Sequence, residues 1–309
     1  MSLETIVAGE EPDASIDDIP SGKGTRSASR GRLVLRRFLR TKRGLVGLTV
    51  LLLLALWALV GSYFGAWNYH QLDDNSILAS PSSLHWFGTD QIGHDIYQQT
   101  VRGLQKSLVI GLLAGPLGTS IAAIVGSCAG YFGGRVDSIL RWIIELLLVV
   151  PSFFILVVIS PKLGGQWLWY VVFIAGFAWM IIAQIVRGQT RSLRDREFVR
   201  AARYMGVSSF TIIRRHIIPN IASLLIIDAT LGVGGAILTE SVLSFLGFGI
   251  QPPDVSLGTL LSSGSNSAVT YPWLFLFPAG VLITTILATS LVGDALRDAV
   301  DPTSGVNHA

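Results

Sequence analysis

Few residues in this chain have the types and spacing that covalent chemistry requires. Gly22 and Lys23 are adjacent, as in a phosphate-binding loop, but Asp17 stands where the first glycine of such a loop belongs. His85 and His94 are nine residues apart in a polar segment, and no long apolar stretch contains a histidine. The long apolar stretches therefore contain no histidine that could act as a base or bind a metal ion. We expect no catalytic residue, no metal site and no cofactor held by this chain itself.

Three carboxylates within or at the ends of apolar stretches remain as candidates for a functional role: Glu145, Asp228 and Glu240. Acidic groups inside a membrane are costly, and they usually face the protein interior or a water-filled path. Glu145 follows Arg141 by one helical turn, which predicts a local ion pair. Asp228 and Glu240 have no basic residue at helical spacing. For these two we predict a place on a translocation path or at a contact with a neighbouring chain.

The elements that carry these residues are apolar helices. Half of the 309 residues are hydrophobic and only 14% are charged, which is typical of a membrane protein. A bilayer core is crossed by about 20 apolar residues in a helix. We predict an all-α protein with six transmembrane helices, at about residues 45–66, 108–132, 139–160, 168–186, 224–245 and 274–292. The single cysteine, Cys128, excludes an intrachain disulfide.

The distribution of basic residues predicts the orientation of these spans in the membrane. With the N-terminus in the cytoplasm, segments flanking the spans hold 18 Lys and Arg inside and 3 outside. Both termini are therefore expected in the cytoplasm. The resulting division is a cytoplasmic tail that is basic near the membrane (1–43), a first span (44–66), an extracytoplasmic segment (67–106), a transmembrane domain (107–302) and a C-terminal tail (303–309). Residues 1–29 lack an apolar stretch, and we predict a disordered tail there.

Glycines and prolines within the spans indicate how they pack. Gly111 with Gly115, and Gly126 with Gly130, are pairs of small residues one turn apart, which permit close helix contacts. Prolines favour bends in helices. We predict static bends at Pro116, Pro151 and Pro278.

The longest cytoplasmic connection, residues 188–222, contains a short amphipathic helix. Phe198, Ala201, Ala202 and Met205 recur at helical spacing and predict one apolar side of low relief. The opposite side is basic, with Arg196, Arg200 and Arg203. We predict that Gly206 ends this helix, that Ser208 or Ser209 caps a second one, and that Pro219 ends the second.

Small residues beside a glycine turn let a partner approach the backbone closely, so this stretch is interpreted as a docking plug. A DNA-binding helix-turn-helix is disfavoured because Phe210, Ile213 and Ile217 are expected at exposed positions where base-reading side chains would be needed.

This stretch resembles the cytoplasmic coupling loop, named EAA, of ABC importer permease subunits. The residues that match the form found in peptide importers are Glu197, Val199, Ala201, Ala202, Gly206, Ser208, Arg215, His216, Pro219 and Asn220. Arg200 stands where the glutamate of the general motif belongs, a departure that the peptide branch shares.

Four more segments resemble the C-type permease subunit of dipeptide and oligopeptide importers. They are residues 87–95, 131–145, 240–253 and 293–302. His94, Trp142 and Glu145 depart from the family pattern, and Glu145 keeps the charge of the residue that it replaces. The resemblance covers about residues 33–302, and its five motifs occur in the family's order.

The resemblance implies a type I ABC importer permease fold in the bacterial inner membrane. Expected partners are a homologous B-type permease subunit, two ABC ATPase subunits that bind ATP and Mg, an extracytoplasmic substrate-binding protein, a peptide substrate and the lipid bilayer, with no nucleic acid. Coupling to the ATPases by alternating access is expected through Glu197, Phe198, Ala201, Ala202, Met205, Gly206, Arg215, His216 and Pro219. Nickel or another small solute is the alternative substrate.

Two functions of other classes fit the sequence less well. An intramembrane protease or phosphatase would need a nucleophile and a base within the spans, where histidine is absent. An ion channel would need a repeated filter or rings of charge. Neither function accounts for the docking plug.

Overall fold

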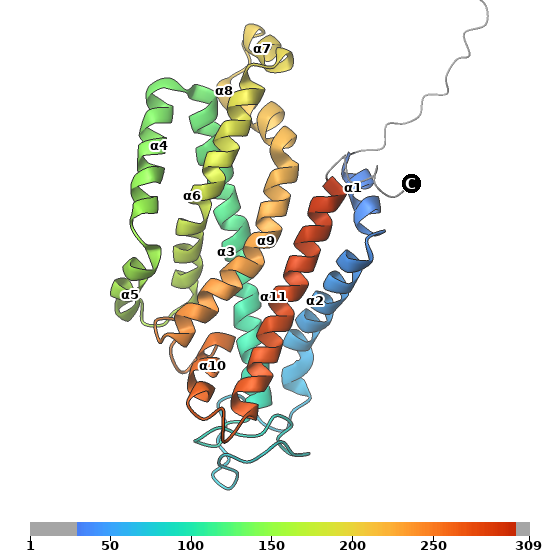
Figure 1. The fold of residues 1–309 in the computed structure, drawn as a ribbon, viewed down its shortest axis with the longest axis vertical. Coiled ribbons are helices and arrows are strands. Elements are labelled where there is room, and N and C mark those ends of the chain that lie inside the picture. The colour runs from blue at the N-terminus through green and yellow to red at the C-terminus, as the bar shows by residue number, and fades with distance from the viewer. Residues whose placement is uncertain (1–29, 301–309) are drawn as a thin grey trace, which may run out of the picture.

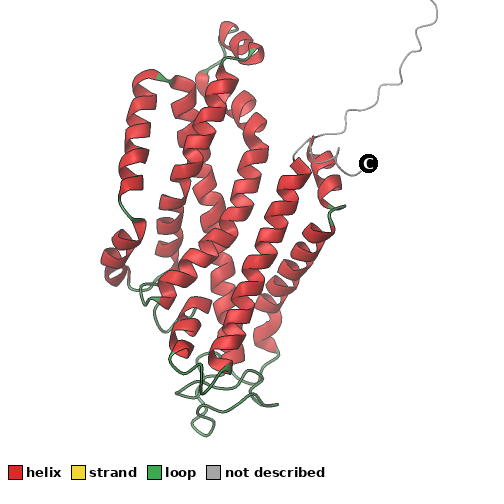
Figure 2. Ribbon diagram, viewed as in Figure 1, coloured by secondary structure: helices red, strands yellow, loops and turns green. Residues whose placement is uncertain are grey.

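The computed structural model describes residues 30–300, which form helices and contain no strand (Figures 1 and 2). The predicted tails at 1–29 and 303–309, and the end of the last family motif at Asp301 and Pro302, lie outside the described residues.

Five helical segments are long and apolar enough to cross a membrane. They are α2 (Lys42–Val60) with the short η1 (Gly61–Tyr63), α3 (Ile96–Phe132), α6 (Trp167–Arg194), the segment Ser209–Phe245 and α11 (Trp273–Val300). A sixth crossing is the pair α4 (Gly134–Val149) and α5 (Ser152–Leu163), which is bent by 70°. The prediction of an all-α protein with six spans is confirmed.

The third crossing bends where a proline was expected to bend it. Pro151 lies between α4 and α5. Helices α3 and α11 continue as single helices through Pro116 and Pro278, and the bends expected at these two prolines stay predictions. Proline removes one backbone hydrogen bond, and packing against neighbouring helices keeps the rest of such a helix intact.

The second crossing begins earlier than its apolar stretch. The carboxylate of Asp95 accepts a hydrogen bond from the backbone N–H of Gln98 at 2.8 Å and caps α3 at Ile96. The last residues of the predicted extracytoplasmic segment 67–106 are therefore helical, and the membrane boundary of this segment stays a prediction. Hydropathy shows where a helix enters lipid, whereas the capping residue decides where it starts.

The fifth crossing contradicts the prediction that a helix ends at Pro219. Instead, α8 (Ser209–Ile212), the π-helical turn η2 (Ile213–Ile217) and α9 (Ile218–Phe245) follow one another without a break. The N–H of Ile218 donates to the carbonyl of Ile213, and the side-chain amide of Asn220 donates to the carbonyl of His216 at 2.6 Å. Pro219 follows this π-helical turn at the start of α9, where a proline without an N–H is tolerated.

Helix α3 packs along α6 and α9, and the predicted glycine pairs lie at these contacts. A Cβ atom on Gly111 or Gly115 would lie 2.6 Å from atoms of α9, and one on Gly126 or Gly130 would lie 2.5 Å from carbonyl oxygens of α6. The prediction that these pairs permit close packing is confirmed.

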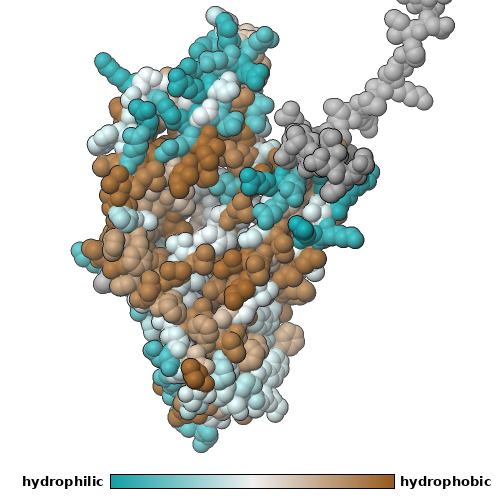
Figure 3. Space-filling view, viewed as in Figure 1, coloured by the Kyte–Doolittle hydropathy of each residue, from teal (hydrophilic) through white to brown (hydrophobic). Residues whose placement is uncertain are grey.

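The two ends of the bundle differ. One end carries α1 (Arg30–Phe38), α7 (Glu197–Tyr204), the first turn of α4 and the last turn of α11 (Figure 1). The other end carries the loops of residues 64–95 and α10 (Leu257–Ser265). An apolar band lies between a strongly hydrophilic end at α7 and a paler opposite end (Figure 3). The described chain begins and ends on the basic side, as the charge bias predicts for the cytoplasm.

Candidate coupling surface and membrane carboxylates

Helix α7 projects from the cytoplasmic end of the bundle (Figure 1). It follows α6 after a two-residue connection, and Glu197 lies in its first turn, where a negative charge is favourable. Gly206 follows its C-terminus with a φ of 75°, so the predicted glycine stop is confirmed. The hydroxyl of Ser208 accepts the N–H of Thr211 and caps α8, as predicted for one of the two serines.

One side of α7 is fixed to the rest of this chain. Val199 and Ala202 are buried in an apolar cluster with Tyr131 of α3 and with Ile212 and Ile217 of the fifth crossing. Ala202 is only 2% exposed. The prediction that Ala202 lies on the free docking side is therefore wrong. The small side chain of Ala202 lets α7 pack closely against the helices of the same chain.

An apolar strip of α7 is exposed within this chain, beside the exposed basic residues Arg200 and Arg203. Phe198, Ala201 and Met205 are exposed, Met205 by 75%. Two further aromatic residues are exposed on either side of the glycine turn: Phe210, as expected from the sequence, and Tyr204, which the sequence did not single out. The helical spacing that predicted the docking side does not include these two aromatic residues. An aromatic residue close to a glycine that ends a helix would have been a usable signal for an exposed contact residue.

The remaining predicted coupling residues lie on the π-helical turn η2 and at the start of α9. Arg215 and Pro219 are exposed, and the ring centroid of His216 lies 6.4 Å from that of Phe198. Ile213 and Ile217, expected at the surface, are buried instead, because the π-helical turn faces them toward α7 and α3. Apart from Ala202, the predicted coupling residues thus lie on an exposed cytoplasmic surface around α7, which we name the α7 surface.

Glu240 lies inside the chain, and this corrects the prediction of a path-facing or partner-facing carboxylate. Its side chain is 0% exposed. Ser244 donates to Oε1 at 2.6 Å, and Ser107 of α3 donates to Oε2 at 3.3 Å. The hydroxyl of Ser256, before α10, lies nearby. Glu240 therefore joins α3, α9 and the start of α10.

Asp228 has a different environment. Its side chain is partly exposed on α9, and the hydroxyl of Thr119 in α3 donates to Oδ2 at 2.5 Å. Within residues 30–300 no ion pair to Asp228 is found. Its place on a translocation path stays a prediction. Glu145 forms the predicted pair with Arg141, at 3.7 Å between Nε and Oε1.

A second cytoplasmic contact comes from the motif at residues 131–145. The guanidinium of Arg187 in α6 donates to both oxygens of Asp137 in α4, with 2.6 Å from Nη2 to Oδ2. This bidentate pair ties the start of the bent crossing to α6.

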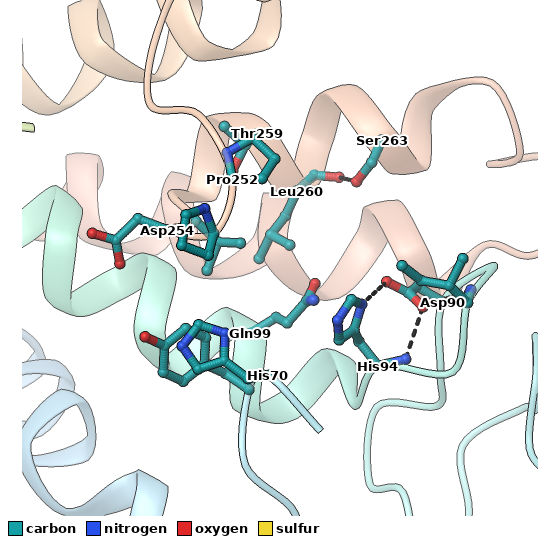
Figure 4. A pocket seen from close by; sticks show the side chains of 13 residues that line it. His70, Asp90, His94, Gln99, Pro252, Asp254, Thr259, Leu260 and Ser263 are labelled. Atoms are coloured by element: carbon teal, nitrogen blue, oxygen red, sulfur yellow. Dashed lines mark hydrogen bonds and ion pairs between the residues drawn. The ribbon is translucent and has the colours of Figure 1, made fainter. Parts of the chain in front are cut away.

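At the outer end, a cavity of about 440 Å³ lies between the loop that contains His70 and His94 and the segment of residues 252–263 (Figure 4). Nδ1 of His94 donates a hydrogen bond to Oδ2 of Asp90 at 2.9 Å. Asp254 pairs with Arg102 at 2.9 Å and with Lys106 at 2.7 Å. Desolvation raises the pKa of Asp254, but the hydrogen bonds from Lys106 and Arg102 outweigh it, so the pKa lies below its ordinary value.

Residues 119–305 match the family model described as the inner membrane component of binding-protein-dependent transport systems, and residues 29–81 match the N-terminal transmembrane domain of oligopeptide transport permease C.

Relatives named oligopeptide transport system permease protein OppC align over nearly their whole length. That of Mycobacterium tuberculosis is 52% identical over 282 residues, which cover 91% of this chain and 97% of the relative. That of Escherichia coli K12 is 39% identical over 86% of this chain and 89% of the relative. That of Bacillus subtilis is 35% identical over 90% and 91%.

Proposed function

Because this chain belongs to the family of inner membrane components of binding-protein-dependent transport systems, we propose that it is the permease subunit of an ATP-driven importer of oligopeptides. The name that its relatives share supports the substrate class. The chain is a multi-pass protein of the inner membrane. A homologous second permease subunit completes the pathway, and a substrate-binding protein delivers the peptide at the outer end.

The observation that carries this proposal is the division of α7 into two sides. Its exposed side, with Phe198, Ala201 and Met205, has the low relief and apolar character that suit a groove on an ATPase subunit. Its buried side, with Val199 and Ala202, packs against α3 and the fifth crossing. A force applied to α7 is therefore applied to two membrane-crossing helices.

The fifth crossing connects α7 to the outer end of the bundle. The segment Ser209–Phe245 is helical over 37 residues, from the cap at Ser208 to the outer end of the bundle. When two ATPase subunits bind ATP and Mg and close, α7 and this helix move together and change which side of the membrane the pathway faces. Close-packed helices move as bodies in this way.

Uptake by the assembled importer tests the proposal. Vesicles that contain this chain, its partner permease, the two ATPases and the binding protein should accumulate labelled oligopeptides only when ATP is present on the ATPase side. Parallel vesicles supplied with dipeptides or Ni²⁺ should accumulate less. ATP-dependent uptake of Ni²⁺ without uptake of peptide would contradict the proposed substrate class.

A further inference from the structure

Helix α1 lies beside the cytoplasmic end of α11 (Figure 1). Phe38 is buried against Ala295 and Ala299, and Val34 packs against the same cluster. Gly44 of α2 makes room for this contact, since a Cβ there would lie 2.5 Å from that of Ala295. One side of α1 is therefore attached to the bundle directly above the first crossing, which starts at Lys42.

The next side of α1 is apolar but is not covered by this chain. Leu35 and Leu39 are one helical turn apart, and both are exposed. The two leucines lie within a few residues of the start of the first crossing, at the level where a membrane ends. Leucines at this position on an amphipathic helix enter the boundary between acyl chains and headgroups.

The third side of α1 and the turn after it are basic. Arg36, Arg37, Arg40, Lys42 and Arg43 are all exposed, and no acidic residue occurs between positions 30 and 43. A further exposed leucine, Leu33, lies on this side. The end of α11 adds Asp294, Arg297 and Asp298 to the surroundings, which leaves four positive charges in excess among the described side chains.

We propose that α1 and the turn of residues 39–43 form a binding site for the headgroups of anionic phospholipids in the cytoplasmic leaflet. In this arrangement the arginines bind phosphate oxygens while Leu35 and Leu39 contact acyl chains.

The combination of features favours a lipid over a soluble partner. Basic residues next to a crossing are expected for orientation alone. Orientation, however, needs neither an ordered amphipathic helix nor an attachment that holds the helix at the membrane boundary. Exposed leucines beside clustered cations match the mixed apolar and anionic chemistry of a lipid headgroup region.

Lipid titration of the full-length chain in detergent tests the site. Native mass spectrometry would follow binding of short-chain phosphatidylglycerol and of short-chain phosphatidylcholine. We expect tighter binding of phosphatidylglycerol. Arg36→Gln, Arg37→Gln and Arg40→Gln together should weaken its binding on the order of tenfold or more, since each charge near an anionic surface contributes roughly fivefold.

The matched control replaces the same three arginines by lysine, which keeps the charge and should keep most of the preference. If the glutamine variant binds phosphatidylglycerol as well as the natural chain does, α1 is not the site. If the lysine variant loses the preference as fully as the glutamine variant, charge is not what is recognised, and the proposal also fails.

A second measurement needs no change of charge. Leu35→Cys, labelled with a spin probe, should lie within the bilayer in vesicles of mixed phosphatidylcholine and phosphatidylglycerol. A probe that is equally exposed to a water-soluble relaxation agent in mixed vesicles and in detergent would overturn the proposal.

Discussion

The hydroxyl of Ser107 in α3 donates a hydrogen bond to the buried carboxylate of Glu240 in α9, with 3.3 Å between Oγ and Oε2. This contact joins the central helix of the bundle to the fifth crossing near its outer end. A carboxylate that is fully buried and surrounded by hydroxyls stabilises the packing of the helices that it joins. Glu240 thus contributes to the structure, whereas Asp228 is partly exposed and its place on a pathway stays a prediction.

The two carboxylates should respond differently to mutation. Glu240→Ala should destabilise the chain by roughly 2 to 4 kcal/mol, because it leaves a cavity and unpaired hydroxyls. Asp228→Asn should keep the melting temperature and lower peptide uptake. The measurements are thermal unfolding in detergent and uptake in vesicles. A stable Glu240→Ala variant, or normal uptake by Asp228→Asn, would contradict this assignment.

The glycine contacts of α3 can be tested with alanine alone. Gly126→Ala should lower the melting temperature, since its Cβ would lie 2.5 Å from the carbonyl oxygen of Ala183, and overpacking typically costs about 1–3 kcal/mol. The control is Gly176→Ala in α6, where a Cβ meets nothing within 4 Å. Alanine is the better helix former, so the control should be neutral or stabilising. Equal melting temperatures for both variants would argue against close packing at Gly126.

The pairing of Asp254 with Lys106 and Arg102 predicts a specific pH dependence. The pKa of Asp254 is lowered below its ordinary value of 3.8, so the stability from this pairing is present above that value. It is lost only as the pH falls through the lowered pKa. The difference in melting temperature between the natural chain and Asp254→Asn should stay constant from about pH 8 to about pH 5. A difference that shrinks steadily over this range would show that the carboxylate is not held by the two cations.

The orientation can be measured by labelling in a background that carries Cys128→Ser. An impermeant thiol reagent added outside intact cells should react with Ser83→Cys and with Val269→Cys, a position that is 99% exposed in the outer loop. Ser192→Cys, exposed at the end of α6, should react only after the cells are opened. Reaction of Ser192→Cys from outside would overturn the topology.

The sequence predicted the features that depend on composition and on short spacing. Six spans, the glycine contacts, the stop at Gly206 and the cap at Ser208 all follow from local rules, and all are present. The errors concern residues whose orientation is decided by packing between distant elements. Ala202 was expected to be free because the spacing that makes a helix amphipathic does not tell which apolar residues meet the chain itself and which meet a partner.

Pro219 and Glu240 show two other limits. Proline ends an isolated helix, but here Pro219 follows a π-helical turn at the start of α9, and the helical segment continues through it. A carboxylate in a span signals a polar surrounding, and at Glu240 that surrounding consists of serines from α3, α9 and the segment before α10, which no helical spacing could reveal.

The central claim is that the exposed side of α7 binds an ATPase subunit while its buried side transmits the motion. Two substitutions and a matched control test the exposed side. Met205→Glu places a charge on the exposed side. Gly206→Val strains the turn that orients this side, because a β-branched residue is poorly tolerated at a φ of 75°. Gly206→Asn is the matched control, since asparagine adopts this backbone conformation more readily.

The most direct measurement is the affinity of purified ATPase subunits for vesicles that carry each variant. Met205→Glu and Gly206→Val should weaken binding by about 1–3 kcal/mol, roughly 5- to 150-fold, and Gly206→Asn should bind nearly as well as the natural chain. ATPase affinity that is unchanged in both Met205→Glu and Gly206→Val, in chains that remain folded, would contradict the assignment of α7 as the coupling element.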